Sequence, residues 1–455
     1  MPVITALTPG NYLIGQPLSA VPDPDVLAVP DNRLRYWQLV QSFHQRIWKR
    51  WQMEYLHQRA KWTSSAPNLK LLVNNEFQEW LQNLSLFFKL LLPVFLLFFF
   101  CEYLIYYVVL IQCHWPSLDT INEEPNIAVG DGGEVKVMLL ADTHLLGSRR
   151  GHWFDKLRRE WQMHRAFQTA ITLHRPDIVF LLCDVFDEGL SCSDAEFNAY
   201  VQRFHSLFRV PTGTQIFVVV GNHDIGFHYG ISPYLQERFT QAFNAPSVRL
   251  LSIAGNHFVL INSMAMEGDG CFLCRPAELQ VNKIASRLQC AKGVGKCRKG
   301  MALKQYSRPI LLQHFPMYRE SDAECNEPDE APEDEKANKF RERWECLSRE
   351  SSEMLFDSLN PRVIMTGHTH HGCHVEHREN KAHEFTIPSF SWRNKDNPSF
   401  ILALFSPNNY AVSKCFMPRE TTVIKIYLLG VPFLVLYGLI TYRRHCKRSR
   451  FFKTH

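Results

Sequence analysis

Two long apolar runs stand out in the pattern of hydrophobic and polar positions along the chain. The first covers residues 90–111 and contains a single charged residue, Glu102; the second covers residues 423–442, with Lys425 near its start. A helix that crosses a bilayer needs ~20 apolar residues, so both runs are long enough. The pattern predicts transmembrane helices at 88–112 and 423–442. A buried core helix is the alternative in each case.

Between these runs, apolar strands alternate with helical segments. A helix is predicted at 153–173, and five buried strands are predicted at 134–141, 177–183, 215–221, 309–313 and 362–367. Short strands dominate 373–415, whereas the acidic, proline-containing insert 320–336 is predicted to be a solvated loop. Strands that alternate with helices favour an α/β sandwich, with two β-sheets flanked by helices, over residues 130–418.

Basic residues predict the orientation in the membrane. A basic tail at 443–455 follows the second apolar run, whereas residues 113–134 contain neither Lys nor Arg. Because cytosolic flanks carry the excess of basic residues, both termini are expected in the cytosol and residues 113–420 on the lumenal side. The net charge of +5 is small for 455 residues and does not indicate a nucleic-acid partner.

Cysteine usage agrees with this orientation. Residues 1–100 contain no cysteine, and most of the 13 cysteines fall in the region expected to be lumenal. In an oxidising compartment they are expected to form disulfides, although their pairing does not follow from sequence. A zinc knuckle built on Cys271 and Cys274 is the alternative, but no second C-x-x-C or pair of histidines completes it.

Five polar clusters follow the five predicted strands. They are Asp142-Thr143-His144, Asp184-Val185-Phe186-Asp187, Gly221-Asn222-His223-Asp224, His314-Phe315-Pro316 and Gly367-His368-Thr369-His370. A single histidine after a strand is more often a loop or core residue. Five clusters in order, each at the carboxyl end of a strand, indicate a common binding site at one edge of the sheets.

This set of clusters resembles the calcineurin-like metallophosphoesterase superfamily, over residues 135–415. The resemblance implies two divalent metal ions, with Mn²⁺ favoured, that activate a water molecule for attack on phosphorus. By correspondence with the family motif, Asp184 bridges the two ions. The implied ligands of one ion are Asp142, His144 and His370, and those of the other are Asn222, His314 and His368. If the H-x-H segment is extended, both of its imidazoles point to the same side.

Catalytic roles are predicted for His223 and Asp187. His223 is expected to protonate the leaving group or to contact the oxyanion, and Asp187 to orient it, with Asp224 behind the ligands. Neither a serine nor a cysteine nucleophile is required, so no covalent intermediate is expected. The chain departs from the family pattern at Cys183, where the family has glycine before the bridging aspartate.

Segments outside the clusters narrow the resemblance. The segment 387–400, which reads I-P-S-F-S-W-R-N-K-D-N-P-S-F, resembles the branch of the superfamily that remodels glycosylphosphatidylinositol (GPI) anchors, as do the segment at 151–163 and the two anchors. This implies removal of ethanolamine phosphate from the second mannose of GPI-anchored proteins. The implied location is endoplasmic reticulum exit sites, the ER–Golgi intermediate compartment and the Golgi, with cargo receptors as further partners. Arg393 either binds substrate or forms a structural ion pair, and Trp392 either lines the cleft or lies in the core.

Two other functions remain open from sequence. One is a lumenal phosphoesterase for nucleotides or lipid head groups, and the other is a non-catalytic trafficking scaffold. Residues 1–80 form an extension expected in the cytosol, and the runs that begin at Ala6, Pro30 and Trp48 resemble the integrase C-terminal region of BEL/Pao retrotransposon polyproteins. That resemblance implies a fused gene model or a captured exon, without an activity of its own.

Overall fold

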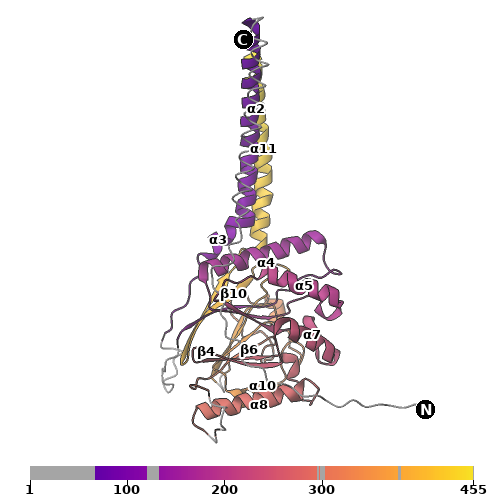
Figure 1. The fold of residues 1–455 in the computed structure, drawn as a ribbon, viewed down its shortest axis with the longest axis vertical. Coiled ribbons are helices and arrows are strands. Elements are labelled where there is room, and N and C mark those ends of the chain that lie inside the picture. The colour runs from indigo at the N-terminus through magenta and orange to yellow at the C-terminus, as the bar shows by residue number, and fades with distance from the viewer. Residues whose placement is uncertain (1–66, 120–132, 295–296, 298–302, 378–380, 454–455) are drawn as a thin grey trace, which may run out of the picture. The chain divides into compact units, whose positions relative to one another are not determined.

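The strands assemble into two stacked sheets in a computed structural model of the chain (Figure 1). Phe87–Arg448 form one unit that contains both sheets, and the segments up to Leu86 and from Ser449 belong to a second unit. The structure describes residues 67–119, 133–294, 297, 303–377 and 381–453, without the side chains of 67–76, 183 and 451–453. Most of the transposon-like extension at 1–80 therefore lies outside the described residues.

The first sheet has five strands and the second has six. The order in the first sheet is β11 (Asn409–Phe416), β10 (Ser399–Ser406), β1 (Val135–Leu140), β2 (Ile178–Cys183) and β3 (Gln215–Val220). The order in the second sheet is β4 (Val248–Ile253), β5 (Asn256–Ile261), β6 (Ile310–Gln313), β7 (Val363–Thr366), β9 (Ala382–Thr386) and β8 (Cys373–His377). Strands β1, β2 and β3 run parallel, as do β5, β6, β7 and β9. The predicted sandwich of two sheets is confirmed.

Helices cover the outer faces of the sheets. They are α4 (Trp153–His174), α5 (Asp194–Leu207), α7 (Pro233–Phe243), α8 (Cys274–Ala291) and α10 (Arg349–Leu359). The short helices α6 (Asn222–Ile225) and α9 (Glu333–Lys336) lie in the connections between strands, as do 3₁₀ turns at Gly189–Ser191, His228–Gly230 and Ser263–Ala265. In β1, Val137 and Leu139 pack between the sheets, whereas Met138 and Leu140 pack on the helix side. Because both faces are buried, these strands read as continuous apolar runs in the sequence.

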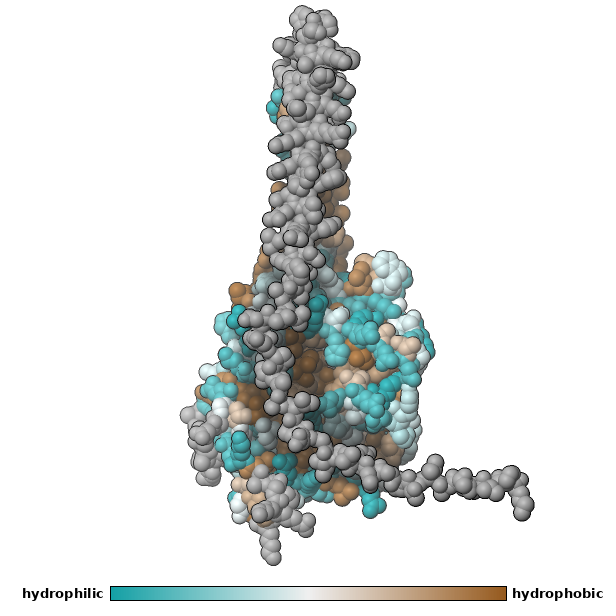
Figure 2. All heavy atoms as spheres, viewed as in Figure 1, coloured by the Kyte–Doolittle hydropathy of each residue, from teal (hydrophilic) through white to brown (hydrophobic). Residues whose placement is uncertain are grey.

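Two apolar helices of the length that crosses a membrane flank the sandwich in sequence. The first consists of α2 (Pro67–Phe99), a π-helical turn (Phe100–Leu104) and α3 (Ile105–Leu110), and the second is α11 (Glu420–Lys453). Two stretches of these helices are apolar enough to cross a bilayer, Phe77–Leu110 and Glu420–Arg450. Only 6% of the most apolar window of each is buried within the protein. Figure 2 shows hydrophobic surface along the parts of these helices that the grey residues leave in view. The two helices indicate that the protein associates with a membrane.

The two apolar helices pack against each other closely. The rings of Phe98 and Tyr427 are 5.6 Å apart, and the Tyr427 hydroxyl donates a 2.6 Å hydrogen bond to Glu102. A Cβ placed on Gly430 would lie 2.9 Å from the methyl groups of Leu97, so this glycine makes space for a leucine of the first helix. The charged residue that interrupts the first apolar run therefore has a partner on the second.

The segment 320–336 is mostly exposed, as predicted, but the prediction of a solvated loop is wrong at the buried positions that anchor it. Cys325 is 2% exposed and forms a disulfide with Cys373 on β8. Asp329 is 1% exposed and forms a 2.6 Å ion pair with Lys414 on β11. Acidic composition alone suggested solvent, but a basic partner and a covalent link hold the insert on the domain.

Disulfides form in the part of the chain between the two apolar helices, as the cysteine pattern predicted. Among the described residues they are Cys113–Cys415, Cys271–Cys274, Cys290–Cys297 and Cys325–Cys373. The first joins the chain just beyond α3 to the last strand, across 302 residues of sequence. This bond ties the exit of one apolar helix to the entry of the other.

Replacement of Cys113 and Cys415 by serine together should lower the stability of the protein by about 2–4 kcal/mol, because a long unfolded loop is then no longer closed. Thermal unfolding of the full chain in lipid nanodiscs measures the effect. Cys446→Ser, which removes an unpaired thiol, is the matched control and should leave the midpoint unchanged. Equal midpoints for the double variant and the parent would contradict the stabilising role.

Candidate metal centre

Polar side chains gather where five strands end, and four of them lie in strained backbone. Asp142 and His144 follow β1, and His368 and His370 follow β7; their φ angles are 50°, 43°, 75° and 64°. This left-handed region costs a residue other than glycine about 1–3 kcal/mol, although Asp and His enter it more readily than most. Strain is thus concentrated at the edge of the sandwich where the donors meet.

The first group of donors contains two imidazoles and two carboxylates. Nε2 of His144 lies 3.0 Å from Nε2 of His370 and 3.7 Å from Oδ2 of Asp184. Asp142 has a carboxylate oxygen within 4.8 Å of the donor atoms of His144 and His370. The Asp142 carboxylate is held in place by a further contact, since its Oδ2 accepts a 2.8 Å hydrogen bond from the backbone N–H of His368.

The second group of donors centres on His314. Its Nε2 lies 3.1 Å from Oδ1 of Asn222, 3.2 Å from Nδ1 of His368 and 3.5 Å from Oδ2 of Asp184. His314 is fully buried and Asn222 is 4% exposed. The close approach depends on Gly367, because a Cβ there would lie 2.6 Å from the carbonyl oxygen of Leu182.

Oδ2 of Asp184 faces both groups of donors. Two sets of nitrogen and oxygen donors that share one carboxylate are the arrangement that a pair of divalent cations requires. The seven residues predicted as ligands are therefore brought together by the fold. Carboxylate, imidazole and amide donors suit Mn, Fe or Zn better than Ca.

Electrostatics give an independent test of that fit. Burial would lower the pKa of His314, but Asp184 and Asp142 raise it to about 9. Burial, and then the charge on His314, lower the pKa of His368 to about 3. Burial would raise the pKa of Asp184, but His314 lowers it below its usual range. The carboxylates thus favour positive charge at the centre of the site, which is what a cation site requires.

Comparison with known proteins gives the family. The sequence profile of calcineurin-like phosphoesterases matches residues 135–372, which contain all five clusters. Metallophosphoesterase 1 of Macaca fascicularis is 48% identical over 358 residues, which cover 78% of this chain and 89% of the relative. That of Gallus gallus is 46% identical over 386 residues, which cover 82% and 94%. The chain belongs to the metallophosphoesterase 1 family of calcineurin-like phosphoesterases. It is a metal-dependent phosphoesterase.

Other similarities are weaker, or are to a family whose function is unknown. A purple acid phosphatase from yellow lupin matches with a TM-score of 0.38 at 12% identity, covering 64% of this chain and 55% of that one. An archaeal phosphodiesterase matches with a TM-score of 0.28 at 11% identity, covering 61% and 99%. A family of unknown function (DUF5641) matches residues 35–76. The retrotransposon origin of that region stays a prediction.

The H-x-H segment of this phosphoesterase is not extended, so its two imidazoles are not sent to the same side as they would be in a strand. Both His368 and His370 are left-handed, so the chain turns sharply after β7. As a result His368 points to His314 and His370 points to His144, in different groups of donors. One short turn therefore contributes to both groups of donors because its backbone is not a strand.

Asp187 contacts more partners than the sequence suggested. Its Oδ1 lies 3.3 Å from Nδ1 of His144, and both of its oxygens lie 3.0 Å from the Arg393 guanidinium. Nδ1 of His223 is 3.8 Å from Oδ1 but 3.3 Å from the backbone oxygen of Asp187. Asp187 thus holds His144 through its carboxylate and His223 through its carbonyl group.

Asp224 fixes the turn that carries Asn222 and His223. Its carboxylate accepts hydrogen bonds from the backbone N–H groups of Val185, Phe186 and Gly221, at 3.1, 2.9 and 3.1 Å. Burial, and then the charge on Asp184, raise the pKa of Asp224 well above its usual range. The residue therefore positions the loops of two clusters, as a residue behind the ligands.

Two contacts at the site escaped sequence reasoning. Nε2 of His368 lies 2.6 Å from the carbonyl oxygen of Trp344, and Arg150 lies 3.6 Å from Asp187. Both partners come from loops without a motif, so no spacing in the sequence indicated them.

Trp392 is 5% exposed and donates to the carbonyl oxygen of Pro418, which places it in the core. The side chain of Cys183 lies outside the described residues.

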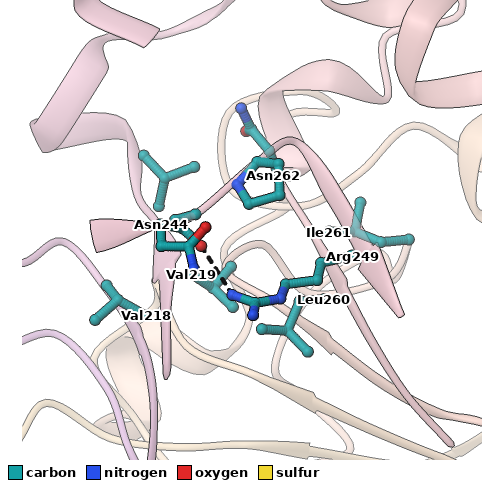
Figure 3. Close-up of a pocket in the computed structure, with 10 residues that line it drawn as sticks. Val218, Val219, Asn244, Arg249, Leu260, Ile261 and Asn262 are labelled. Atoms are coloured by element: carbon teal, nitrogen blue, oxygen red, sulfur yellow. Dashed lines mark hydrogen bonds between the residues drawn. The ribbon is translucent and has the colours of Figure 1, made fainter. Parts of the chain in front are cut away.

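Two further features lie outside the metal centre. A pocket between β3, β4 and β5 is crossed by a hydrogen bond from Arg249 to the carbonyl oxygen of Asn244 (Figure 3). Its volume open to water-sized molecules is about 10 Å³, which suits one water molecule rather than a substrate. Cys271 and Cys274 are joined to each other, so the structure favours a disulfide over the zinc knuckle.

Asp184→Asn should lower bound metal to less than one ion per chain and reduce phosphoesterase activity by at least 10³-fold, because the shared carboxylate holds both cations. Elemental analysis and turnover of a soluble phosphodiester measure the two effects. Asp177→Asn is the matched control, since that carboxylate accepts a hydrogen bond from the backbone of Lys136. Full metal content in Asp184→Asn would remove Asp184 from the site.

Proposed function

We propose that this phosphoesterase removes ethanolamine phosphate from the second mannose of GPI anchors already attached to protein. The observation that carries the proposal is a phosphoesterase site on a domain flanked at both ends by apolar helices. A substrate held in the same membrane gains effective concentration without any new contact. The resemblance of segment 387–400 to GPI-remodelling enzymes supplies the choice of ester.

The proposed setting is the lumen of the early secretory pathway. The disulfide between Cys113 and Cys415 favours an oxidising compartment. The basic end of α11, with Arg443, Arg444 and Lys447, favours a cytosolic C-terminus. In this orientation the GPI glycan and the site lie on the same side of the membrane. The proposed domain boundaries are those at 88–112, 130–418 and 423–442.

The proposed mechanism assigns a task to each group of residues. Asp142, His144, Asp184 and His370 would hold one divalent cation, and Asp184, Asn222, His314 and His368 the other, with Mn²⁺ favoured by family resemblance. When bound, such a pair polarises the phosphate and lowers the pKa of water. His223, whose side chain is 35% exposed, gives a proton from Nε2 to the leaving oxygen while Asp187 holds Nδ1. The Arg393 guanidinium, which is 28% exposed, binds a phosphate oxygen.

Arg393→Gln should raise KM for a phosphodiester about tenfold, because a charged hydrogen bond to phosphate is lost. Steady-state kinetics measure the change, and Arg275→Gln on the exposed side of α8 is the control. A fall in thermal stability with KM unchanged would make Arg393 a structural ion pair instead.

The substrate is tested in cells that lack their own GPI-remodelling activity. Expression of this chain should remove the ethanolamine phosphate branch from the second mannose, as read by mass spectrometry of released anchors. Asp184→Asn should not remove it. If the branch persists while the purified protein still hydrolyses a soluble phosphodiester, the GPI proposal fails and another lumenal ester is the substrate. If both activities are absent, the scaffold hypothesis gains instead.

A further inference from the structure

Helix α4 presents apolar side chains that the domain leaves uncovered. Trp153, Phe154, Leu157 and Trp161 are 67%, 56%, 57% and 41% exposed. At about 100° per residue, these four positions fall within an arc of about 100° on one side of the helix. Exposed apolar side chains that gather on one helix face indicate a surface covered by another molecule or by lipid.

The same side of α4 contacts the first apolar helix. The Trp161 indole N–H donates a 3.1 Å hydrogen bond to the backbone oxygen of Glu102. The Arg165 guanidinium lies 4.0 Å from the ring centre of Tyr103. Residues 161 and 165 thus bring α4 against the π-helical turn where the first span meets the domain.

The second apolar helix is bound to α4 as well. Arg158 forms a 2.8 Å ion pair with Glu420, the first residue of α11. Contacts at Arg158 and Trp161 therefore fix α4 at the lumenal ends of both spans. Figure 1 shows α4 lying across the end of the domain from which α2 and α11 leave. A helix in that place lies along the membrane surface rather than through it.

We propose that the face formed by Trp153, Phe154, Leu157 and Trp161 inserts into the lumenal surface of the bilayer. Trp is enriched at the boundary between lipid and water, and basic residues beside an apolar face favour lipid head groups. Arg149 and Arg150 in the loop before α4, and Lys156 within it, provide those charges. The inference rests on α2 and α11 spanning the bilayer, which makes lipid continuous with this face.

The membrane contact lies close to the metal centre. The loop before α4 reaches the site directly, since Arg150 pairs with Asp187 at 3.6 Å and the backbone N–H of Arg149 donates to Glu188 at 3.1 Å. Only two residues separate Arg150 from Trp153. Insertion of the face thus holds the metal centre beside the bilayer, where a membrane-tethered phosphoester is found.

Lipid contact is tested by quenching of a fluorescent label in nanodiscs that contain brominated phosphatidylcholine. The full chain carries Cys446→Ser, and the label is placed through Leu157→Cys or, as matched control, Leu279→Cys on α8. Both leucines are well exposed, at 57% and 63%, so either substitution should leave the fold intact. Labelling of the Cys446→Ser parent is subtracted as background.

Brominated lipid should quench the label at position 157 at least twofold more than at position 279, and aqueous iodide should show the reverse order. Equal quenching by lipid at both positions would overturn the proposal. So would protection of position 157 that appears only in native membranes and not in nanodiscs, because a protein partner would then cover the face. The measurement needs no turnover, so a negative result would count against lipid contact and not against the GPI substrate.

Discussion

Repulsion between buried carboxylates is the constraint around which the site is organised. Asp142 and Asp184 are almost fully buried and lie next to each other, and Asp224 is buried just behind them. Such a group of charges is unstable without compensating charge or hydrogen bonds. The backbone N–H groups and imidazoles around them provide part of that compensation, and cations held by the donors on either side of Asp184 would provide the rest.

The two sheets supply the rigidity that such crowding needs. Strands β1, β2 and β3 end at one edge, and β6 and β7 bring their own ends to meet them, so that donors far apart in sequence become neighbours. The four left-handed residues at this edge store a cost that regular packing behind them offsets. A metal ion bound there would offset this cost further, because it would stabilise the folded state and not the unfolded state.

Strands and clusters were readable from sequence because each strand is buried on both faces and each cluster follows directly. The turn at His368 and His370 could not be predicted from the sequence, because nothing in H-x-H distinguishes a left-handed turn from an extended segment. Pairing of Asp187 with Arg393 crosses more than 200 residues, at 3.0 Å, and depends on how the sheets stack. The burial of Asp329 was hidden for a similar reason, because its partner Lys414 lies on a strand distant in sequence.

The attachment of α4 to the end of the first apolar helix and to the start of the second has a mechanical consequence. A domain joined to the membrane by one flexible stem can lean and sample many heights, whereas this domain is held through Trp161 on one stem and Arg158 on the other. The distance between lipid and metal centre then becomes a fixed property of the protein. If α4 lies on the bilayer as proposed, selectivity would also depend on height above the membrane, because an ester carried well above the head groups would be out of reach of the metal centre.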